Sequence, residues 1–100
     1  MQFVLIGHDG TDPGAMDRRM AAREQHLALF DCLVREGVFQ HGAALLDDDG
    51  RMVGSLILCD FESREALDDQ WLKREPYVLG GVWKRVDIHR IQSRPTRTEA

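Results

Sequence analysis

Apolar residues form several short runs along the chain, separated by polar turns. In residues 2–8 both alternating sets of positions are apolar, which predicts a strand with apolar side chains on both faces: Phe3 and Leu5 on one, Val4 and Ile6 on the other. The Asp-Gly pair at 49–50 suits a tight hairpin turn over residues 47–50, because glycine adopts a positive φ without strain. The same analysis predicts three further strands, over residues 38–46, 52–61 and 82–91.

Two helices are predicted between the strands. The longer one covers residues 15–36 and ends at Gly37, a typical C-terminal stop. The shorter one begins after the N-cap residue Ser63, runs to about Arg74 and stops before Pro76. The resulting order, βαββαβ, is that of the ferredoxin-like fold. It is an α+β architecture in which both helices cover one face of a four-stranded antiparallel sheet.

The other face of this sheet has no predicted cover. Because the first and third strands carry apolar side chains on both faces, a monomer would expose a large apolar patch. We therefore expect a homodimer in which two sheets pack face to face, as in a dimeric α/β barrel. A single domain is expected over residues 1–91, followed by a flexible polar tail over residues 92–100.

Composition and charge narrow the class of protein. The chain has 100 residues, 43% hydrophobic and 30% charged, as is typical of one globular domain. Residues 1–83 carry eight basic and 15 acidic side chains, a balance of −7, which argues against nucleic acid as the main partner. With no apolar run of membrane-spanning length and no secretory signal pattern, we expect a cytoplasmic protein with no membrane partner. Cys32 and Cys59 are then expected to remain thiols.

Three polar side chains interrupt the apolar face of the long helix. At about 100° per residue, Arg19, Arg23 and His26 lie in the middle of the apolar arc. Burying charge without partners is costly, so such exceptions are candidates for a functional site. A structural explanation also stays open, because arginine can keep its charged end in water and a histidine can be a hydrogen-bonded core residue. The arc comprises Met16, Met20, Ala22, Leu27, Leu29, Phe30, Leu33 and Val34.

The predicted topology brings possible partners to the same edge of the sheet. Asp9 ends the first strand, and the segment Glu75-Pro76-Tyr77 follows the second helix. A carboxylate beside His26 would fix its tautomer for general acid–base work, with Glu75 and Asp9 as the alternatives. Arg19 and Arg23 could hold an anionic substrate, and Tyr77 could donate a hydrogen bond to a developing oxyanion.

In these segments the chain resembles the YciI-like (YCII-related) family. The resemblance covers about residues 1–91. Its motifs are His8-Asp9, Arg19 with Arg23-Glu24-Gln25-His26-Leu27, Gly42, Asp49-Gly50 with Gly54-Ser55, and Glu75-Pro76-Tyr77 with Gly81-Val82. It implies a ferredoxin-like fold, dimeric assembly and a histidine–aspartate site. Some related proteins carry out lyase or dehydrochlorinase chemistry on substituted aromatic compounds, and structurally kindred barrels include isomerases and cofactor-free oxygenases.

The family residues map onto this sequence with two departures. The family histidine corresponds to His26 and the acid of its first strand to Asp9. The family's Asp-Pro-Tyr element is Glu75-Pro76-Tyr77 here, so the carboxylate stands one methylene further from the backbone. Residues 42–44 are Gly-Ala-Ala where the family usually has Gly-Pro, which would change the wall of a pocket.

Two functions remain open at this stage. The first is a cofactor-free, metal-free enzyme of lyase, dehydrochlorinase or isomerase type. It would act on a small anionic substrate, with aromatic compounds among the candidates. The second is a non-catalytic dimer that binds a small ligand or a partner. A calcium loop at Asp47 is unsupported because the twelfth position is Leu58 rather than a glutamate. A metal site shared by His8, His41 and His26, and a haem ligated by His26, are weaker alternatives.

Overall fold

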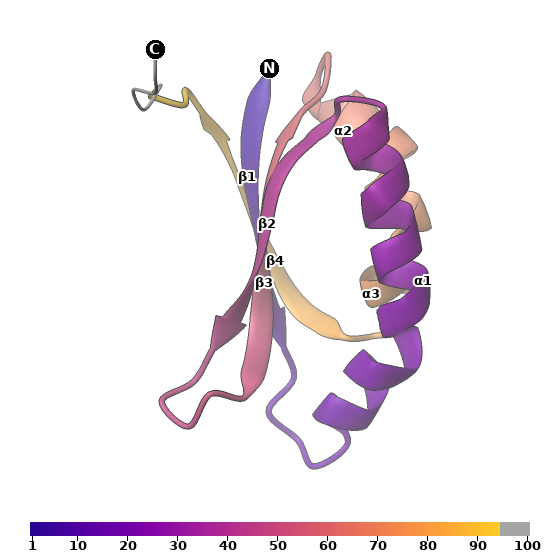
Figure 1. Ribbon diagram of the computed structural model, residues 1–100, viewed down its shortest axis with the longest axis vertical. Helices are drawn as coiled ribbons and strands as arrows, with labels where there is room; N and C mark the ends of the chain where they lie inside the picture. Colours follow the sequence, from indigo (N-terminus) through magenta and orange to yellow (C-terminus); the bar gives the residue numbers. More distant parts are fainter. Residues whose placement is uncertain (95–100) are drawn as a thin grey trace.

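A four-stranded antiparallel sheet, in the order β2-β3-β1-β4, forms the centre of the structure (Figure 1). The computed structural model describes residues 1–94, and residues 95–100, most of the expected tail, lie outside the described residues. The elements are β1 Gln2–Asp9, α1 Ala15–Arg35, β2 Phe39–Leu46, β3 Met52–Asp60, α2 Arg64–Gln70, the 3-10 helix η1 Leu72–Arg74, α3 Pro76–Leu79 and β4 Trp83–Ile91. The predicted ferredoxin-like α+β fold is confirmed. No helix of residues 1–94 is long and apolar enough to cross a membrane.

The second helical segment differs from its prediction. Ser63 does cap α2, since its hydroxyl accepts a hydrogen bond from the Ala66 backbone N–H at 3.0 Å. However, α2 ends at Gln70, and Pro76 begins the additional short helix α3 instead of ending the segment. Proline suits the first turn of a helix because that turn needs no backbone donor from it. Helix α3 was not predicted from the sequence, because a proline after a helix also indicates the end of that helix.

The core between sheet and helices is rich in aromatic rings. Trp71 is fully buried at its centre, with its ring perpendicular to those of Phe39 and Trp83. Trp83 lies against β1 at Gly7, where a Cβ atom would come within 2.5 Å of the indole ring. Glycine at this position therefore lets the Trp83 ring lie directly over the strand, next to the candidate site.

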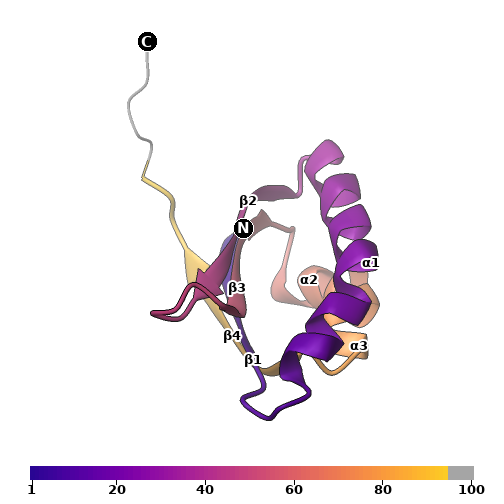
Figure 2. The same cartoon turned by 60° about the horizontal axis from the view of Figure 1, so that its bottom comes forward.

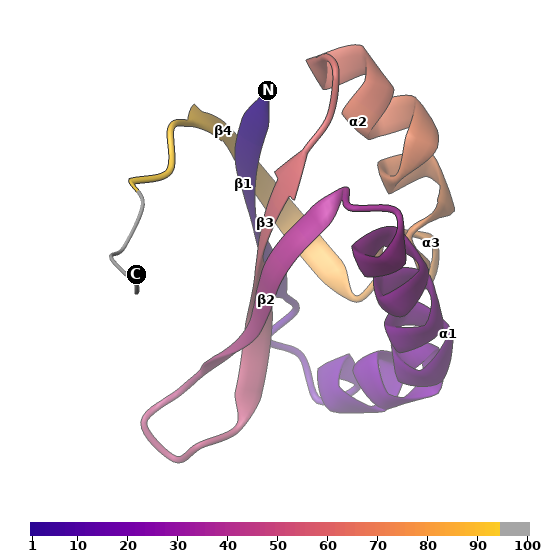
Figure 3. The same cartoon turned by 45° about the horizontal axis from the view of Figure 1, so that its top comes forward.

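The two faces of the sheet have different surroundings. All the helices lie on one side, and the other side is open (Figure 2). In β1, Phe3 and Leu5 are buried under the helices, whereas the alternating residues Val4 and Ile6 are half-buried on the open face. The hairpin between β2 and β3 extends beyond the rest of the sheet (Figure 3). The apolar open face expected from the sequence is therefore present in the single chain.

Candidate active site

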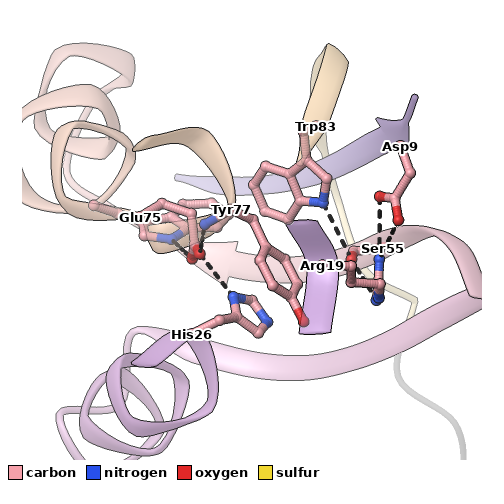
Figure 4. Close-up of polar contacts among 8 residues, drawn as sticks. Asp9, Arg19, His26, Ser55, Glu75, Tyr77 and Trp83 are labelled. Atoms are coloured by element: carbon pink, nitrogen blue, oxygen red, sulfur yellow. Dashed lines mark hydrogen bonds and ion pairs between the residues drawn. The ribbon is translucent and has the colours of Figure 1, made fainter. Parts of the chain in front are cut away.

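A buried imidazole–carboxylate pair connects helix α1 to the segment before α3. His26 and Glu75 are 7% and 1% exposed, and His26 Nδ1 lies 2.7 Å from Glu75 Oε2 (Figure 4). His26 lies on the face of α1 that packs on the sheet, and Glu75 is the N-cap residue of α3. Of the two carboxylates considered from the sequence, the structure pairs Glu75 with His26. The longer glutamate side chain reaches the imidazole directly.

The partners of Glu75 decide which nitrogen of His26 carries its proton. The carboxylate also accepts hydrogen bonds from the Tyr77 backbone N–H and the Trp71 indole N–H, both at 2.9 Å. Two of its three partners can only donate, and an ionised carboxylate accepts from all three. His26 Nδ1 is then the third donor, so Nε2 of the neutral ring is free to accept a proton. This is the arrangement that a general base requires.

Tyr77 stacks on the imidazole. The rings of Tyr77 and His26 are 3.9 Å apart between centroids and 9° from parallel. Burial raises the pKa of the Tyr77 hydroxyl above its ordinary value, although the guanidinium groups of Arg19 and Arg23 act in the opposite direction. The hydroxyl therefore keeps its proton at neutral pH and is available as a hydrogen-bond donor.

Arg19 forms a second buried ion pair in the site. Its Nη1 donates to both oxygens of Asp9, at 2.9 and 3.1 Å, and the two side chains are only 4% and 3% exposed. Its Nη2 donates to Ser55 Oγ at 3.3 Å, and the Trp83 indole N–H donates to the same oxygen at 3.2 Å. The guanidinium also lies over the Tyr77 ring, with 4.9 Å from Cζ to the centroid.

This ion pair bears on two roles expected from the sequence. Asp9 pairs with Arg19 and not with His26. Arg19 lines the cavity with its charge paired to Asp9, and its role in binding an anionic substrate stays a prediction. Its contacts instead hold together the end of β1, the middle of β3 and the ring of Tyr77.

Arg23 is placed differently from its two companions on α1. The sequence analysis put it in the middle of the apolar arc, but it is exposed, as are Met20, Leu27 and Val34 of that arc. The helix faces the sheet instead with Arg19, Ala22, His26 and Leu33. Among residues 1–94 no ion pair to Arg23 is present, so it is an uncompensated positive charge at the edge of the site.

A cavity of about 220 Å³ joins these groups. A cavity of about 150 Å³ in another protein holds benzene, so this one has room for a substituted ring. Most of its wall is apolar, with a small number of polar groups, as in many small-molecule sites. The lining residues are Arg19, Arg23, His26, Leu27, Phe30, Gly42, Ala43, Ala44, Met52, Ser55, Ile57 and Tyr77.

Gly42 shapes the wall on the β2 side. A Cβ atom at this position would come within 2.5 Å of the Phe30 ring, so the absence of a side chain allows Phe30 to line the cavity. Within the described range 1–94, no three histidine, cysteine, aspartate or glutamate side chains gather closely enough to hold a metal ion. Asp47 instead caps the hairpin, accepting from the backbone N–H groups of Asp49 and Arg51.

The remaining histidines and cysteines lie away from the cavity. His8 pairs with Asp87 at 3.0 Å, and β1 alternation places it on the open face of the sheet. His41 is exposed on β2. Burial raises the pKa of the Cys59 thiol to about 12, which makes it a poor nucleophile at neutral pH.

Two site partners, Ser55 and Trp71, were not assigned to the site from the sequence. A Glu-Pro pair after a helix is a signal that could have located Glu75 as the cap of a new helix. Nothing in the local sequence shows which donors reach its carboxylate, because these come from segments that meet only on folding.

The fold and the buried pair define a ferredoxin-like α+β protein with an imidazole–carboxylate site. A family model of the YCII-related domain matches residues 1–92, and the chain belongs to this family. It is 32% identical to an uncharacterized protein of Haemophilus influenzae, over 88% of this chain and 93% of that protein.

Two solved structures share the fold. One is a 5-chloro-2-hydroxyhydroquinone dehydrochlorinase from Burkholderia phenoliruptrix AC1100, in complex with 2,5-dihydroxybenzoquinone. It is 23% identical, with a TM-score of 0.77 over 92% of this chain and 94% of that chain. The other is a dimeric ferredoxin-like protein of unknown function from Jannaschia sp. CCS1, 19% identical, with a TM-score of 0.50 over 92% and 98% of the two chains. At these identities the likeness concerns the fold alone.

Asp9→Asn tests the buried ion pair with Arg19. The amide keeps the shape of the carboxylate but leaves the guanidinium uncompensated, so we expect the free energy of unfolding to fall by about 3–5 kcal/mol in urea titrations. Asp69→Asn is the matched control, because Asp69 is in an exposed pair with Lys73 on the helical side of the molecule and should matter little. If the free energy of unfolding falls by the same small amount in both variants, the Asp9–Arg19 pair does not stabilise the fold as described.

Proposed function

We propose that the chain is a small-molecule enzyme that uses His26 and Glu75 as an acid–base pair on a small anionic substrate. The observation that carries this proposal is the hydrogen bond from His26 Nδ1 to Glu75, which leaves Nε2 as a base in a cavity. Tyr77 donates a hydrogen bond to an oxygen where negative charge develops. Arg23 attracts the anionic part of the substrate, since no side chain of residues 1–94 forms an ion pair with it.

The proposed reaction class is elimination or isomerisation. His26 Nε2 takes a proton from the substrate, and the electron pair of the broken bond moves into the neighbouring π-system. In an elimination, this electron pair forms the new double bond, and a leaving group on the substrate departs with the pair that bound it. In an isomerisation, protonated His26 returns the proton at another atom of the substrate. The carboxylate of Glu75 stabilises the imidazolium formed between the two steps.

Aromatic hydroxy compounds are the first substrates to examine. The dehydrochlorinase that shares the fold binds 2,5-dihydroxybenzoquinone. The apolar wall and the volume of the cavity suit a single substituted ring, and Arg23 suits an ionised hydroxyl group on it. These features favour a lyase or dehydrochlorinase-type activity for this chain over chemistry on a large or neutral substrate.

We also propose that the protein works as a cytoplasmic homodimer joined through the open face of the sheet. Val4, Ile6, Leu56 and Leu58 form a half-buried apolar patch on neighbouring strands, β1 and β3. A second copy would cover this patch with the same surface, as two-fold symmetry requires. The Jannaschia protein that shares this fold is described as dimeric, which supports the proposed homodimer. Both cysteines are free, which suits a reducing compartment.

His26→Gln tests whether the chain is an enzyme. The amide still has an N–H group to offer Glu75 but has no basic nitrogen. Chloride release from 5-chloro-2-hydroxyhydroquinone should be measurable with the natural chain and fall by at least about 100-fold in the variant, as general-base removal implies. Affinity for 2,5-dihydroxybenzoquinone, measured by calorimetry, should change far less. Binding without turnover in the natural chain would instead favour the alternative, a non-catalytic ligand-binding dimer.

Arg23→Gln tests the source of anion recognition. Removing one charge-assisted hydrogen bond should weaken the binding of 2,5-dihydroxybenzoquinone by roughly tenfold or more. The fold should be unaffected because Arg23 is exposed. Arg35→Gln, an exposed arginine on the same helix outside the cavity lining, is the control. Equal affinities in the two variants would rule out the role given to Arg23.

Leu56→Glu tests the dimer interface. A carboxylate on the open face would be buried without a partner in the face-to-face dimer, so analytical ultracentrifugation should show a shift from dimer to monomer. Val34→Glu is the control, because Val34 is an exposed apolar residue on α1, away from the open face. A natural chain that sediments as a monomer, or a Leu56→Glu variant that remains dimeric, would contradict the proposed interface.

A further inference from the structure

We infer that Trp71 is a positioning residue for the base. Its indole N–H fixes the carboxylate of Glu75, and the fixed carboxylate determines which nitrogen of His26 carries the proton. The inference rests on the proposed function in one respect, the identity of the base as His26 Nε2. Trp71 itself does not line the cavity and acts only through Glu75.

The two oxygens of Glu75 have separate partners. Oε2 accepts from His26 Nδ1 and from the Tyr77 backbone N–H, at 2.7 and 2.9 Å. Oε1 accepts from the Trp71 indole N–H at 2.9 Å. With Glu75 only 1% exposed, no water replaces a lost donor without rearrangement. The indole N–H is therefore the donor to Oε1, and it holds the carboxylate plane in the orientation that His26 meets.

The indole ring is itself fixed on several sides. It is fully buried, with its ring edge-to-face with Phe39 at 4.6 Å and with Trp83 at 6.4 Å, and parallel to Phe61 at 6.3 Å. Trp71 also stands at the break between α2 and η1, four residues before Glu75. The broken helix thus places a rigid donor and the carboxylate beside each other.

A phenyl ring would suffice if Trp71 only filled the core. A buried indole N–H normally has a partner, but this partner is the carboxylate that is also hydrogen-bonded to the imidazole. Without this donor, Oε1 would be left unsatisfied and the carboxylate would turn to regain a hydrogen bond. The preference of His26 for the proton on Nδ1 would then weaken. Molecules with the proton on Nε2 cannot accept one from a substrate.

Trp83 provides a matched comparison within the same aromatic cluster. It is also buried, and its indole N–H also donates to a side-chain oxygen near the cavity, but that oxygen belongs to Ser55. Trp71→Phe and Trp83→Phe therefore remove the same atoms from neighbouring positions in one core. Only the first removes a hydrogen bond to Glu75.

The test is ¹⁵N nuclear magnetic resonance of the His26 ring in the ligand-free chain, at a pH of about 8.5, above the ordinary titration range of histidine. The natural chain and Trp83→Phe should both show the proton on Nδ1. In Trp71→Phe, the ratio of the Nδ1-protonated form to the Nε2-protonated form should fall by roughly tenfold, the equivalent of about one hydrogen bond. A role in packing alone would leave this ratio unchanged.

An unchanged ratio in Trp71→Phe, or an equal fall in Trp83→Phe, would overturn the inference. If Trp71→Phe does not fold, Trp71 is replaced by 3-benzothienylalanine, which keeps both fused rings but lacks the N–H group. The ratio of the two protonated forms of His26 is then measured in that chain, with the same expected fall. The proposed function can fail separately. If the ratio responds as expected but His26→Gln retains full turnover, Trp71 positions His26 but His26 is not the base.

Discussion

The buried carboxylate of Glu75 is the group on which the rest of the site depends. A carboxylate that is 1% exposed is stable only when its oxygens are hydrogen-bonded. Three segments supply the donors: His26 from α1, Trp71 from the end of α2, and the first turn of α3 through Tyr77. The same hydrogen bonds that satisfy the charge therefore join the helices to one another and set the tautomer of the imidazole.

The site contains two buried side-chain pairs, and the two pairs have different roles. Asp9 and Arg19 neutralise each other and hold β1 against β3 and Tyr77. Glu75 and His26 present one basic nitrogen to the cavity. In the proposed function, the positive charge of Arg23 at the rim attracts the anionic substrate, since Arg19 is already paired with Asp9. The same proposal makes His26 the base that transfers the proton.

Much of the fold could be predicted from the sequence, because strand alternation, the Asp49-Gly50 turn and the Ser63 cap are local signals. The same holds for Arg19 and His26, since buried polar residues on a helix face are visible as exceptions to its apolar pattern. The partners were less accessible. Whether Asp9 or Glu75 reaches His26 depends on the rotation of α1 about its axis. The apolar arc predicted a rotation in which Met20, Leu27 and Val34 face the sheet, but in the structure these three side chains are exposed. The short helix α3 sets the direction of Glu75, which is its N-cap residue. It begins at Pro76, where the local sequence pattern indicates only the end of the preceding helix.

A crystal structure of the chain with 2,5-dihydroxybenzoquinone tests the central claim most directly. The account predicts the ring inside the cavity, with one substrate atom at a hydrogen-bond distance of about 2.6–3.2 Å from His26 Nε2, while Nδ1 remains on Glu75. An anionic oxygen should face Arg23. A ligand bound elsewhere on the chain, or an imidazole that leaves Glu75 to meet the ligand through Nδ1, would contradict it.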